Sequence, residues 1–228
     1  MMIKAVIFDM DGVIVDTEPV NQQRIFQYIR QYNSSVKEED LNDIVGRGSK
    51  EIWDILARVS GSGKDAEELK EEFRFHWIPR HCGKIDYTAL FRPAVQEVLS
   101  YARANGIRTA VASSTEYEKV KAILTEVGVF DSMDAVISGE DCGRPKPYPD
   151  VYLETAKRLG VSPKECLVIE DSTVGIEAAH RAGTIVAALI DNRFPFDRGR
   201  ADVELASVAD AILLIDQERK KEKMRSSI

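Results

Sequence analysis

Five short apolar segments, each of the length of a β-strand, recur along the chain. They lie at residues 4–8, 107–113, 134–138, 166–170 and 184–190. The segments are apolar almost throughout and rich in valine and isoleucine, which is typical of strands that are covered on both faces. The hydrophobic pattern therefore predicts a sheet of buried strands.

Helical patterns separate the later strands. We expect helices at about 116–127, 150–159 and 173–182. A glycine stands near the C-terminal end of each helix, where a left-handed cap is often needed. These glycines are Gly128, Gly160 and Gly183. Alternation of strand with helix predicts an α/β fold with a doubly wound parallel sheet.

The stretch 16–85 breaks this alternation. It contains no convincing strand but several helical patterns, in which apolar side chains recur every three or four residues. We therefore expect a core of residues 1–15 and 86–228 and an inserted α-helical cap of residues 16–85. An insertion at the carboxyl end of a strand lies over the crevice where ligands bind in such sheets, so the cap is expected to act as a lid.

Composition narrows the class of protein. With 228 residues, 44% of them apolar, the chain is long enough for one substantial domain with a smaller partner. Its net charge of -7 argues against a nucleic-acid surface, and no apolar run has the length of a membrane span. No secretory signal is visible, and the three cysteines lack metal-ligand spacing. We expect a cytoplasmic monomer that binds neither nucleic acid nor membrane.

Acidic side chains stand at the ends of two predicted strands. Asp9 and Asp11 close the first strand, and Glu170 and Asp171 follow the fourth. Residues two apart in an extended segment point to the same side, so Asp9 and Asp11 can face one site. Four carboxylates at the ends of parallel strands repel one another unless a cation lies between them. The cofactor that we expect is a hard divalent ion with oxygen ligands, most simply Mg²⁺.

A site of this kind implies an anionic ligand, and phosphate is the common one. Ser113 and Ser114 end the second strand at the mouth of a helix, where hydroxyls and backbone amides can bind phosphate oxygens. Lys146 stands between Pro145 and Pro147 and is a further candidate, the alternative being a solvated surface lysine. Four carboxylates against Mg²⁺ and one lysine leave one surplus negative charge. That charge disappears if one carboxyl keeps its proton, as a general acid requires.

In this order, these features resemble the haloacid dehalogenase superfamily, in its phosphatase and β-phosphoglucomutase-like subgroup with a helical cap. The resemblance rests on "DMDGVIVD" (9–16), the serine after the second strand, the lysine flanked by prolines, and "EDSTVGIEAAHRAG" (170–183). It implies a Rossmann-like core with a helical cap and the activity of an Mg²⁺-dependent phosphoric monoester hydrolase.

The resemblance also implies a role for each core residue. Asp9 would be the nucleophile that forms an aspartyl-phosphate, and Asp11 would protonate the leaving oxygen and then activate water. Ser113 and Lys146 would hold the phosphoryl group. The implied Mg²⁺ ligands are Asp9, the backbone carbonyl of Asp11, and Asp171, with Glu170 in support.

The cap is expected to select the substrate. Asn21 stands where mutases of this type carry a histidine, and this difference favours hydrolysis by water. In the loop 45–52, Arg47 and Lys50 are candidates for contacting the substrate, the alternative being solvated cations at a helix start. His76 is expected to pack into the core of the cap.

Three functions remain open from the sequence. The first is a phosphatase that acts on a small phosphate monoester, such as a sugar phosphate. The second is a β-phosphoglucomutase-like sugar-phosphate mutase. The third is a phosphate-binding regulatory protein that kept the fold without turnover, although loss of Asp9 or Asp11 would be its mark and both are present.

Overall fold

The computed structural model describes residues 2–44 and 47–226. The chain forms two compact units. The first unit consists of Met1–Asp16, Tyr87–Asp191 and Asp197–Ile228. The second consists of Thr17–Asp86 and Asn192–Phe196.

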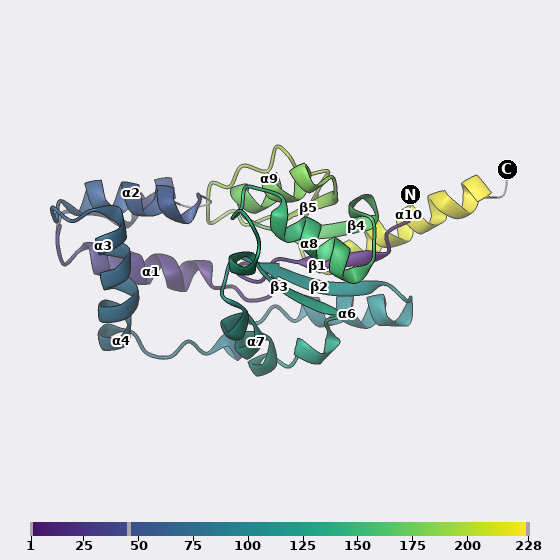
Figure 1. The fold of residues 1–228 in the computed structure, drawn as a ribbon, viewed down its shortest axis with the longest axis horizontal. Helices are drawn as coiled ribbons and strands as arrows, with labels where there is room; N and C mark the ends of the chain where they lie inside the picture. The colour runs from purple at the N-terminus through teal and green to yellow at the C-terminus, as the bar shows by residue number, and fades with distance from the viewer. Residues whose placement is uncertain (1, 45–46, 227–228) are drawn as a thin grey trace. The chain divides into compact units, whose positions relative to one another are not determined.

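Six parallel strands form the centre of the first unit (Figure 1). They are β1 (Ala5–Phe8), β2 (Arg108–Ser113), β3 (Ala135–Ser138), β4 (Cys166–Glu170), β5 (Ile185–Leu189) and β6 (Val203–Leu205). Their order across the sheet is β3-β2-β1-β4-β5-β6. The first five occupy the predicted segments. The sixth was not predicted, because three residues with a glutamate in the middle carry no apolar run.

Helices cover both faces of the sheet. Helices α8 (Asp150–Leu159) and α9 (Thr173–Ala182) lie on one face, and α6 (Ala94–Ala104) and α7 (Tyr117–Glu126) lie on the other (Figure 1). The last helix, α10 (Asp210–Ser226), packs beside α6. The shorter helical elements of this unit are α5 (Tyr87–Leu90) and the 3-10 turns Phe130–Ser132, Gly139–Asp141 and Pro163–Glu165. None of the helices in the described ranges is both long and apolar enough to span a lipid bilayer.

The side chains of β1 show why the sheet needs cover on both sides. Val6 and Phe8 belong to the apolar cluster under α6 and α7, whereas Ala5 and Ile7 belong to the cluster under α8 and α9. All four side chains are buried. Since successive strand residues point to opposite faces, a continuous apolar run requires two covering layers. The expected doubly wound parallel α/β sheet is confirmed.

The second unit is helical, with no strand among the described residues of 17–86. Its elements are α1 (Glu18–Ile29), a 3-10 segment (Glu38–Ile44), α2 (Ser49–Ser60), α3 (Ala66–Glu71), a π-helical turn (Glu72–Trp77) and α4 (Ile78–His81). The apolar stripes of these helices meet in one cluster. Its largest members are Tyr28, Trp53, Leu56, Phe73 and Trp77.

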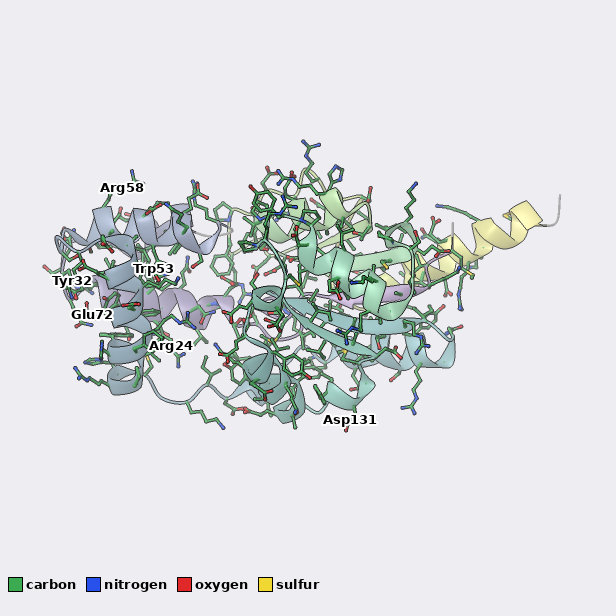
Figure 2. All side chains as sticks on the ribbon, viewed as in Figure 1. Arg24, Tyr32, Trp53, Arg58, Glu72 and Asp131 are labelled. Carbon is green, nitrogen blue, oxygen red and sulfur yellow. The ribbon has the colours of Figure 1, made fainter. Side chains whose placement is uncertain are left out.

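A network of hydrogen bonds and one ion pair within this helical unit centres on Glu72. The hydroxyls of Tyr28 and Tyr32 donate to Glu72 Oε2 at 3.0 and 2.5 Å, and Lys64 pairs with the same oxygen. Figure 2 shows Tyr32, Trp53 and Glu72 among these helices and Arg58 pointing away from them. His76 is exposed, so the expectation that it packs into the cap was wrong. The π-helical turn directs Phe73 and Trp77 inward, whereas the residues between them, His76 included, face solvent.

Candidate active site

Four neighbouring strands bring the candidate residues of the first unit together. Asp9 follows β1, Ser113 ends β2, Ser138 ends β3 and Glu170 ends β4. Because these strands are parallel and adjacent, their carboxyl ends meet at one edge of the sheet. The backbone amide of Asp9 donates to the carbonyl oxygen of Ile169 at 3.0 Å, which extends the pairing of β1 with β4 into the site.

A buried lysine joins two of the acids. Lys146 Nζ lies 2.6 Å from Asp9 Oδ1 and 2.7 Å from Glu170 Oε1, and it donates to the carbonyl oxygen of Ala112 at 3.3 Å. The three charged side chains are almost fully buried. Because its side chain is buried, Lys146 is not a solvated surface lysine. A buried cation requires charged partners, and Asp9 and Glu170 provide them.

Hydrogen bonds from five donors hold Glu170 in place. Its Oε1 accepts from Lys146 and, at 2.7 Å, from the hydroxyl of Tyr152. Its Oε2 accepts from the backbone amides of Asp171 and Ser172 and from the Ser172 hydroxyl, each at 3.0 Å. The Ser172 hydroxyl also caps α9 by accepting from the backbone amide of Gly175. Glu170, at the end of β4, is thus hydrogen-bonded to α8 through Tyr152 and to the start of α9 through Ser172.

The burial of several like charges dominates the electrostatics. Burial raises the pKa of Asp9 to about 8, and Glu170 and Asp11 add to this rise while Lys146 opposes it. Burial would also raise the pKa of Glu170, but the charge and hydrogen bonds of Lys146 outweigh it and hold that pKa below the usual value. Burial disfavours the charged form of Lys146, yet Asp9 and Glu170 raise its pKa well above the usual value. A cation in addition to Lys146 would relieve the remaining repulsion among the carboxylates of Asp9, Asp11 and Glu170.

Three carboxylates of this group have the arrangement of a metal site. Asp9, Glu170 and Asp171 each offer an oxygen, and these oxygens lie within 4.8 Å of one another. Buried carboxylate oxygens are the ligands that Mg²⁺ prefers, so the donor set fits that ion. Glu170 already accepts five hydrogen bonds, and Asp9 and Asp171 are therefore the better placed ligands. The backbone carbonyl of Asp11 stays a predicted ligand.

Thr115 connects Asp11 with the serine that ends β2. The Thr115 hydroxyl donates to Asp11 Oδ2 at 3.1 Å, and its backbone amide donates to Ser113 Oγ at 3.1 Å. Ser113 is buried, whereas Ser114 is exposed. A hydroxyl oxygen that accepts one bond still carries a hydrogen to donate, so Ser113 remains suited to a phosphate oxygen. The roles of both serines stay predictions.

Gly12 allows a close approach that no other residue type permits. Its φ is +84°, and a Cβ atom built there would lie 1.8 Å from Asp171 Oδ2. The side chain of Arg92 holds the same loop, donating from Nε to the Gly12 carbonyl oxygen at 2.9 Å and pairing with Asp16 at 3.2 Å. The loop after Asp11 is therefore fixed against Asp171.

We predict that Gly12→Ala removes most of the hydrolytic turnover that the sequence motifs imply, because the new methyl group must displace the Asp171 carboxylate. Gly183→Ala is the matched control, since Gly183 also has a positive φ (+74°) but has open space around its Cβ position. The control is expected to lose about 1–2 kcal/mol of unfolding free energy, the cost of a left-handed residue, and to keep its turnover. The measurements are kcat and the denaturant midpoint of both variants. Equal turnover of Gly12→Ala and the wild type would contradict the packing described for Asp171.

The candidate substrate residues of the helical unit have local partners. Asn21 is half-buried in α1. Arg47 Nη1 lies 2.5 Å from Glu51 Oε1, and Lys50 Nζ lies 2.7 Å from Asp54 Oδ2. Both cations are exposed, as expected for pairs one helical turn apart on a solvated surface. Residues 45–46 of the predicted loop lie outside the described residues. A substrate role for Asn21, Arg47 and Lys50 stays a prediction.

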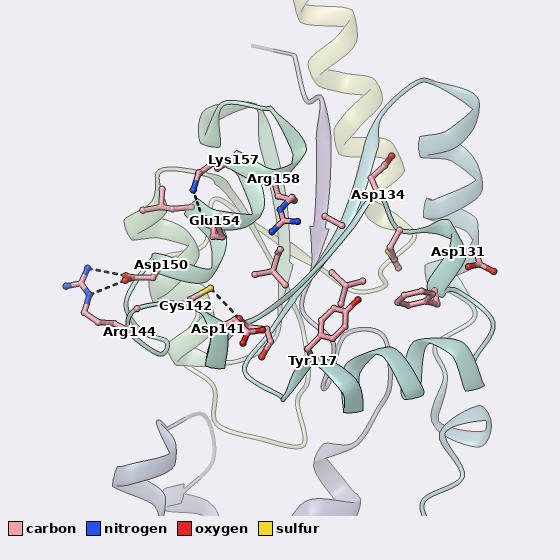
Figure 3. Close-up of a pocket in the computed structure, with 18 residues that line it drawn as sticks. Tyr117, Asp131, Asp134, Asp141, Cys142, Arg144, Asp150, Glu154, Lys157 and Arg158 are labelled. Atoms are coloured by element: carbon pink, nitrogen blue, oxygen red, sulfur yellow. Dashed lines mark hydrogen bonds and ion pairs between the residues drawn. The ribbon is translucent and has the colours of Figure 1, made fainter.

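A large hollow of about 1030 Å³ lies elsewhere in the first unit. It follows the outer edge of β3 and is flanked by Tyr117 of α7 and by Glu154, Lys157 and Arg158 of α8 (Figure 3). Asp9, Asp11, Lys146, Glu170 and Asp171 are not among its lining residues. This hollow is therefore separate from the acidic cluster.

Sequence reasoning did not find Tyr152, Thr115 or Arg92. Tyr152 is indistinguishable in sequence from any aromatic residue on the buried face of a helix. Thr115 directly follows Ser113 and Ser114, and this run of three hydroxyl residues is the sequence feature that could have indicated it. Arg92 gave no signal, because its contact with Gly12 spans 80 residues of sequence.

The fold and the cluster define a class of protein: parallel α/β proteins with acidic residues at the carboxyl ends of the central strands. The family model for haloacid dehalogenase-like hydrolases matches residues 3–183. Hexitol phosphatase B of Escherichia coli (strain K12) is 31% identical over 216 residues, which cover 91% of this chain and 94% of that protein. The chain therefore belongs to the haloacid dehalogenase-like hydrolase family, as the sequence motifs indicated.

Two further proteins resemble this chain, one in sequence and one in fold. The phosphorylated carbohydrates phosphatase of Thermotoga maritima is 29% identical over 208 residues, covering 90% of this chain and 93% of that protein. The crystal structure of β-phosphoglucomutase from Clostridium difficile has the same fold, with a TM-score of 0.72 at 22% identity, covering 98% of this chain and 99% of that chain. The relatives named as phosphatases confirm the predicted enzyme class, phosphoric monoester hydrolase.

Proposed function

We propose that this enzyme is an Mg²⁺-dependent phosphatase that hydrolyses a small phosphate monoester, such as a sugar phosphate, through an aspartyl-phosphate on Asp9. The observation that carries the proposal is the placement of Lys146 Nζ between Asp9 and Glu170, with an oxygen of Asp171 in the same cluster. A buried nucleophilic carboxylate, a fixed cation and an adjacent metal-type cluster are the parts that phosphoryl transfer requires. The core unit would carry out the chemistry and the helical unit would act as the cap.

In the first half of the reaction, Asp9 attacks the phosphorus atom and the bond from phosphorus to the ester oxygen breaks. Asp11 gives its proton to that oxygen, and the alcohol leaves. Lys146 holds an oxygen of the phosphoryl group beside Asp9, and the Ser113 hydroxyl donates to another. Asp9 and Asp171 would hold Mg²⁺, which would supply positive charge to offset the negative charge of the transferring group and would favour the ionised form of Asp9.

In the second half, Asp11 takes a proton from water and the resulting nucleophile attacks the phosphorus atom. The bond from phosphorus to Asp9 breaks, inorganic phosphate forms, and both aspartates return to their starting states. Thr115 supports this exchange because its hydroxyl donates to Asp11 Oδ2 and orients that carboxyl group. The cycle consumes one ester and one water and yields one alcohol and one phosphate.

The names of the relatives support a carbohydrate-type substrate. One is a hexitol phosphatase and another acts on phosphorylated carbohydrates. A sugar-phosphate mutase is the second candidate, supported by the similarity in fold to β-phosphoglucomutase. Asn21, in place of the histidine carried by mutases of this type, supports hydrolysis. We propose that Asn21, Arg47 and Lys50 read the part of the substrate beyond the phosphate.

We predict that phosphate release from a panel of hexitol and sugar monophosphates requires Mg²⁺ and stops when EDTA is in excess. Adding back Mg²⁺ should restore the rate, because the ligands are preformed side chains of the folded enzyme. The measurement is inorganic phosphate released per minute, with Ca²⁺ as a control ion of the same charge but larger radius. Full activity in EDTA would contradict the metal requirement. Isomerisation that depends on a sugar bisphosphate, with little phosphate release, would instead support the mutase.

A further inference from the structure

Tyr152 lies directly beneath the phosphate-binding lysine of the proposed mechanism. It belongs to α8 and is completely buried. Its hydroxyl donates to Glu170 Oε1 at 2.7 Å, and the centre of its ring lies 5.0 Å from Lys146 Nζ. A lysine at this distance from an aromatic ring is attracted by its π electrons. Tyr152 therefore contacts Lys146 through its ring and Glu170 through its hydroxyl.

The tyrosine hydroxyl and the lysine compete for one oxygen atom. Both donate to Glu170 Oε1, and each lies 2.7 Å from it. The charge of Glu170 is thus divided between two donors at Oε1, while three other donors hold Oε2. Without the hydroxyl, Lys146 would be the sole donor at Oε1 and would be drawn toward Glu170.

The three hydrogens of the Lys146 ammonium group have unequal partners. Two are directed to carboxylate oxygens, of Asp9 at 2.6 Å and of Glu170 at 2.7 Å. The third is directed to the carbonyl oxygen of Ala112 at 3.3 Å, the longest of the three bonds. This weakest bond is the one that a phosphoryl oxygen can replace at the least cost. The replacement requires that Nζ stay close to Asp9, where the phosphoryl group is formed.

We propose that Tyr152 is a positioning residue, which keeps Lys146 Nζ beside Asp9 by sharing Glu170 Oε1 and by supporting the ammonium group with its ring. The inference rests on the proposed function for Lys146. It goes beyond that function because Tyr152 touches neither the substrate nor the metal ligand Asp171 in the proposed reaction. A phenylalanine would fill the same space in the core and keep the aromatic ring, so replacing Tyr152 with phenylalanine isolates the contribution of the hydroxyl.

The first test compares Tyr152→Phe with the wild type. We expect kcat/KM for the best sugar phosphate to fall about tenfold, the scale of one hydrogen bond to a charged group. We also expect binding of inorganic phosphate, measured by calorimetry with Mg²⁺ present, to weaken severalfold. The matched control is Tyr101→Phe, because the Tyr101 hydroxyl donates to the carboxylate of Asp216 between α6 and α10, away from the site. That variant should lose stability but neither turnover nor phosphate binding.

The second test asks whether Tyr152 acts through Lys146. In a Lys146→Met background, adding Tyr152→Phe should change residual turnover and phosphate binding by less than twofold, because the positioned group is gone. A purely structural role would give the same fractional loss in both backgrounds and would overturn the proposal. Far-ultraviolet circular dichroism and melting temperature establish that each variant is folded. If Lys146→Met does not fold, Lys146→Arg provides the second background, and there the loss should again be smaller than in the wild type.

The outcomes separate this inference from the proposed function. Unchanged turnover and unchanged phosphate binding in Tyr152→Phe would overturn the role of Tyr152 alone. A wild-type enzyme that releases no phosphate from any ester would overturn the proposed function. In that case the calorimetric comparison still decides the inference, since it measures inorganic phosphate binding without turnover.

Discussion

Asp9→Asn is expected to reduce phosphate release by at least about a thousandfold, the scale seen when a catalytic nucleophile is removed. The neutral amide is a poor nucleophile toward phosphorus and a poor ligand for Mg²⁺. The substitution conserves shape, and Lys146 keeps its second carboxylate partner, Glu170, so the fold should survive. The measurement is kcat under saturating substrate and Mg²⁺, with melting temperature as the check on folding.

Asp131→Asn is the matched control for this substitution. Asp131 is exposed on the 3-10 turn Phe130–Ser132, in the same unit but outside the acidic cluster (Figure 2). Surface changes of this kind usually alter stability by less than about 0.5 kcal/mol, and turnover should be unchanged. If Asp9→Asn kept more than about a tenth of wild-type turnover, outside the range for loss of a nucleophile, the attacking group would have to be another residue.

Asp11→Asn is expected to lower turnover by about 10²–10⁴-fold, the usual contribution of general acid–base catalysis. The two half-reactions should respond differently. An aryl phosphate has a leaving group that needs little protonation, so attack by Asp9 should continue. Water, however, would lack its base, and the aspartyl-phosphate should accumulate. Intact-mass measurement after acid quenching should detect one phosphoryl group on the chain.

The double variant, Asp9→Asn with Asp11→Asn, is the control for this trapping experiment. It should carry no phosphoryl group, because the proposed attachment point is absent. Phosphorylation that persists in the double variant would assign the intermediate to another residue. Full turnover in Asp11→Asn would contradict the role of Asp11 as the general acid of the mechanism.

The sequence was most informative where chemistry and secondary structure coincide. Asp9 and Glu170 each stand at the carboxyl end of an apolar run, and parallel strands bring such ends to one edge of the sheet. Their proximity could therefore be inferred without coordinates. Lys146 was a weaker inference, because its loop position is compatible with a solvated side chain. Its burial between two carboxylates 137 and 24 residues away along the chain required the folded structure.

The residues that the sequence missed have contacts that no local pattern encodes. Tyr152 occupies an ordinary core position of α8, and Arg92 precedes α6 as one of many arginines. Tyr152 reaches Glu170 only when α8 packs against the central strands. Likewise, Arg92 reaches the carbonyl oxygen of Gly12 only when the loop before α6 packs there. Strand β6 could not be predicted from the sequence either, because its three residues pair with β5 but do not form an apolar run.

By itself, the sequence determined the α/β architecture and predicted an acidic site at the carboxyl ends of the strands, because hydrophobic periodicity and the order of acidic motifs are local properties of the chain. Only the tertiary structure decided which oxygen each cation binds, that Glu170 is saturated by five donors, and that Gly12 leaves room for Asp171. The physical reason is that hydrogen bonds and buried ion pairs depend on distances of a few tenths of an ångström. Such distances arise from the packing of elements far apart in the chain, which no residue pattern records.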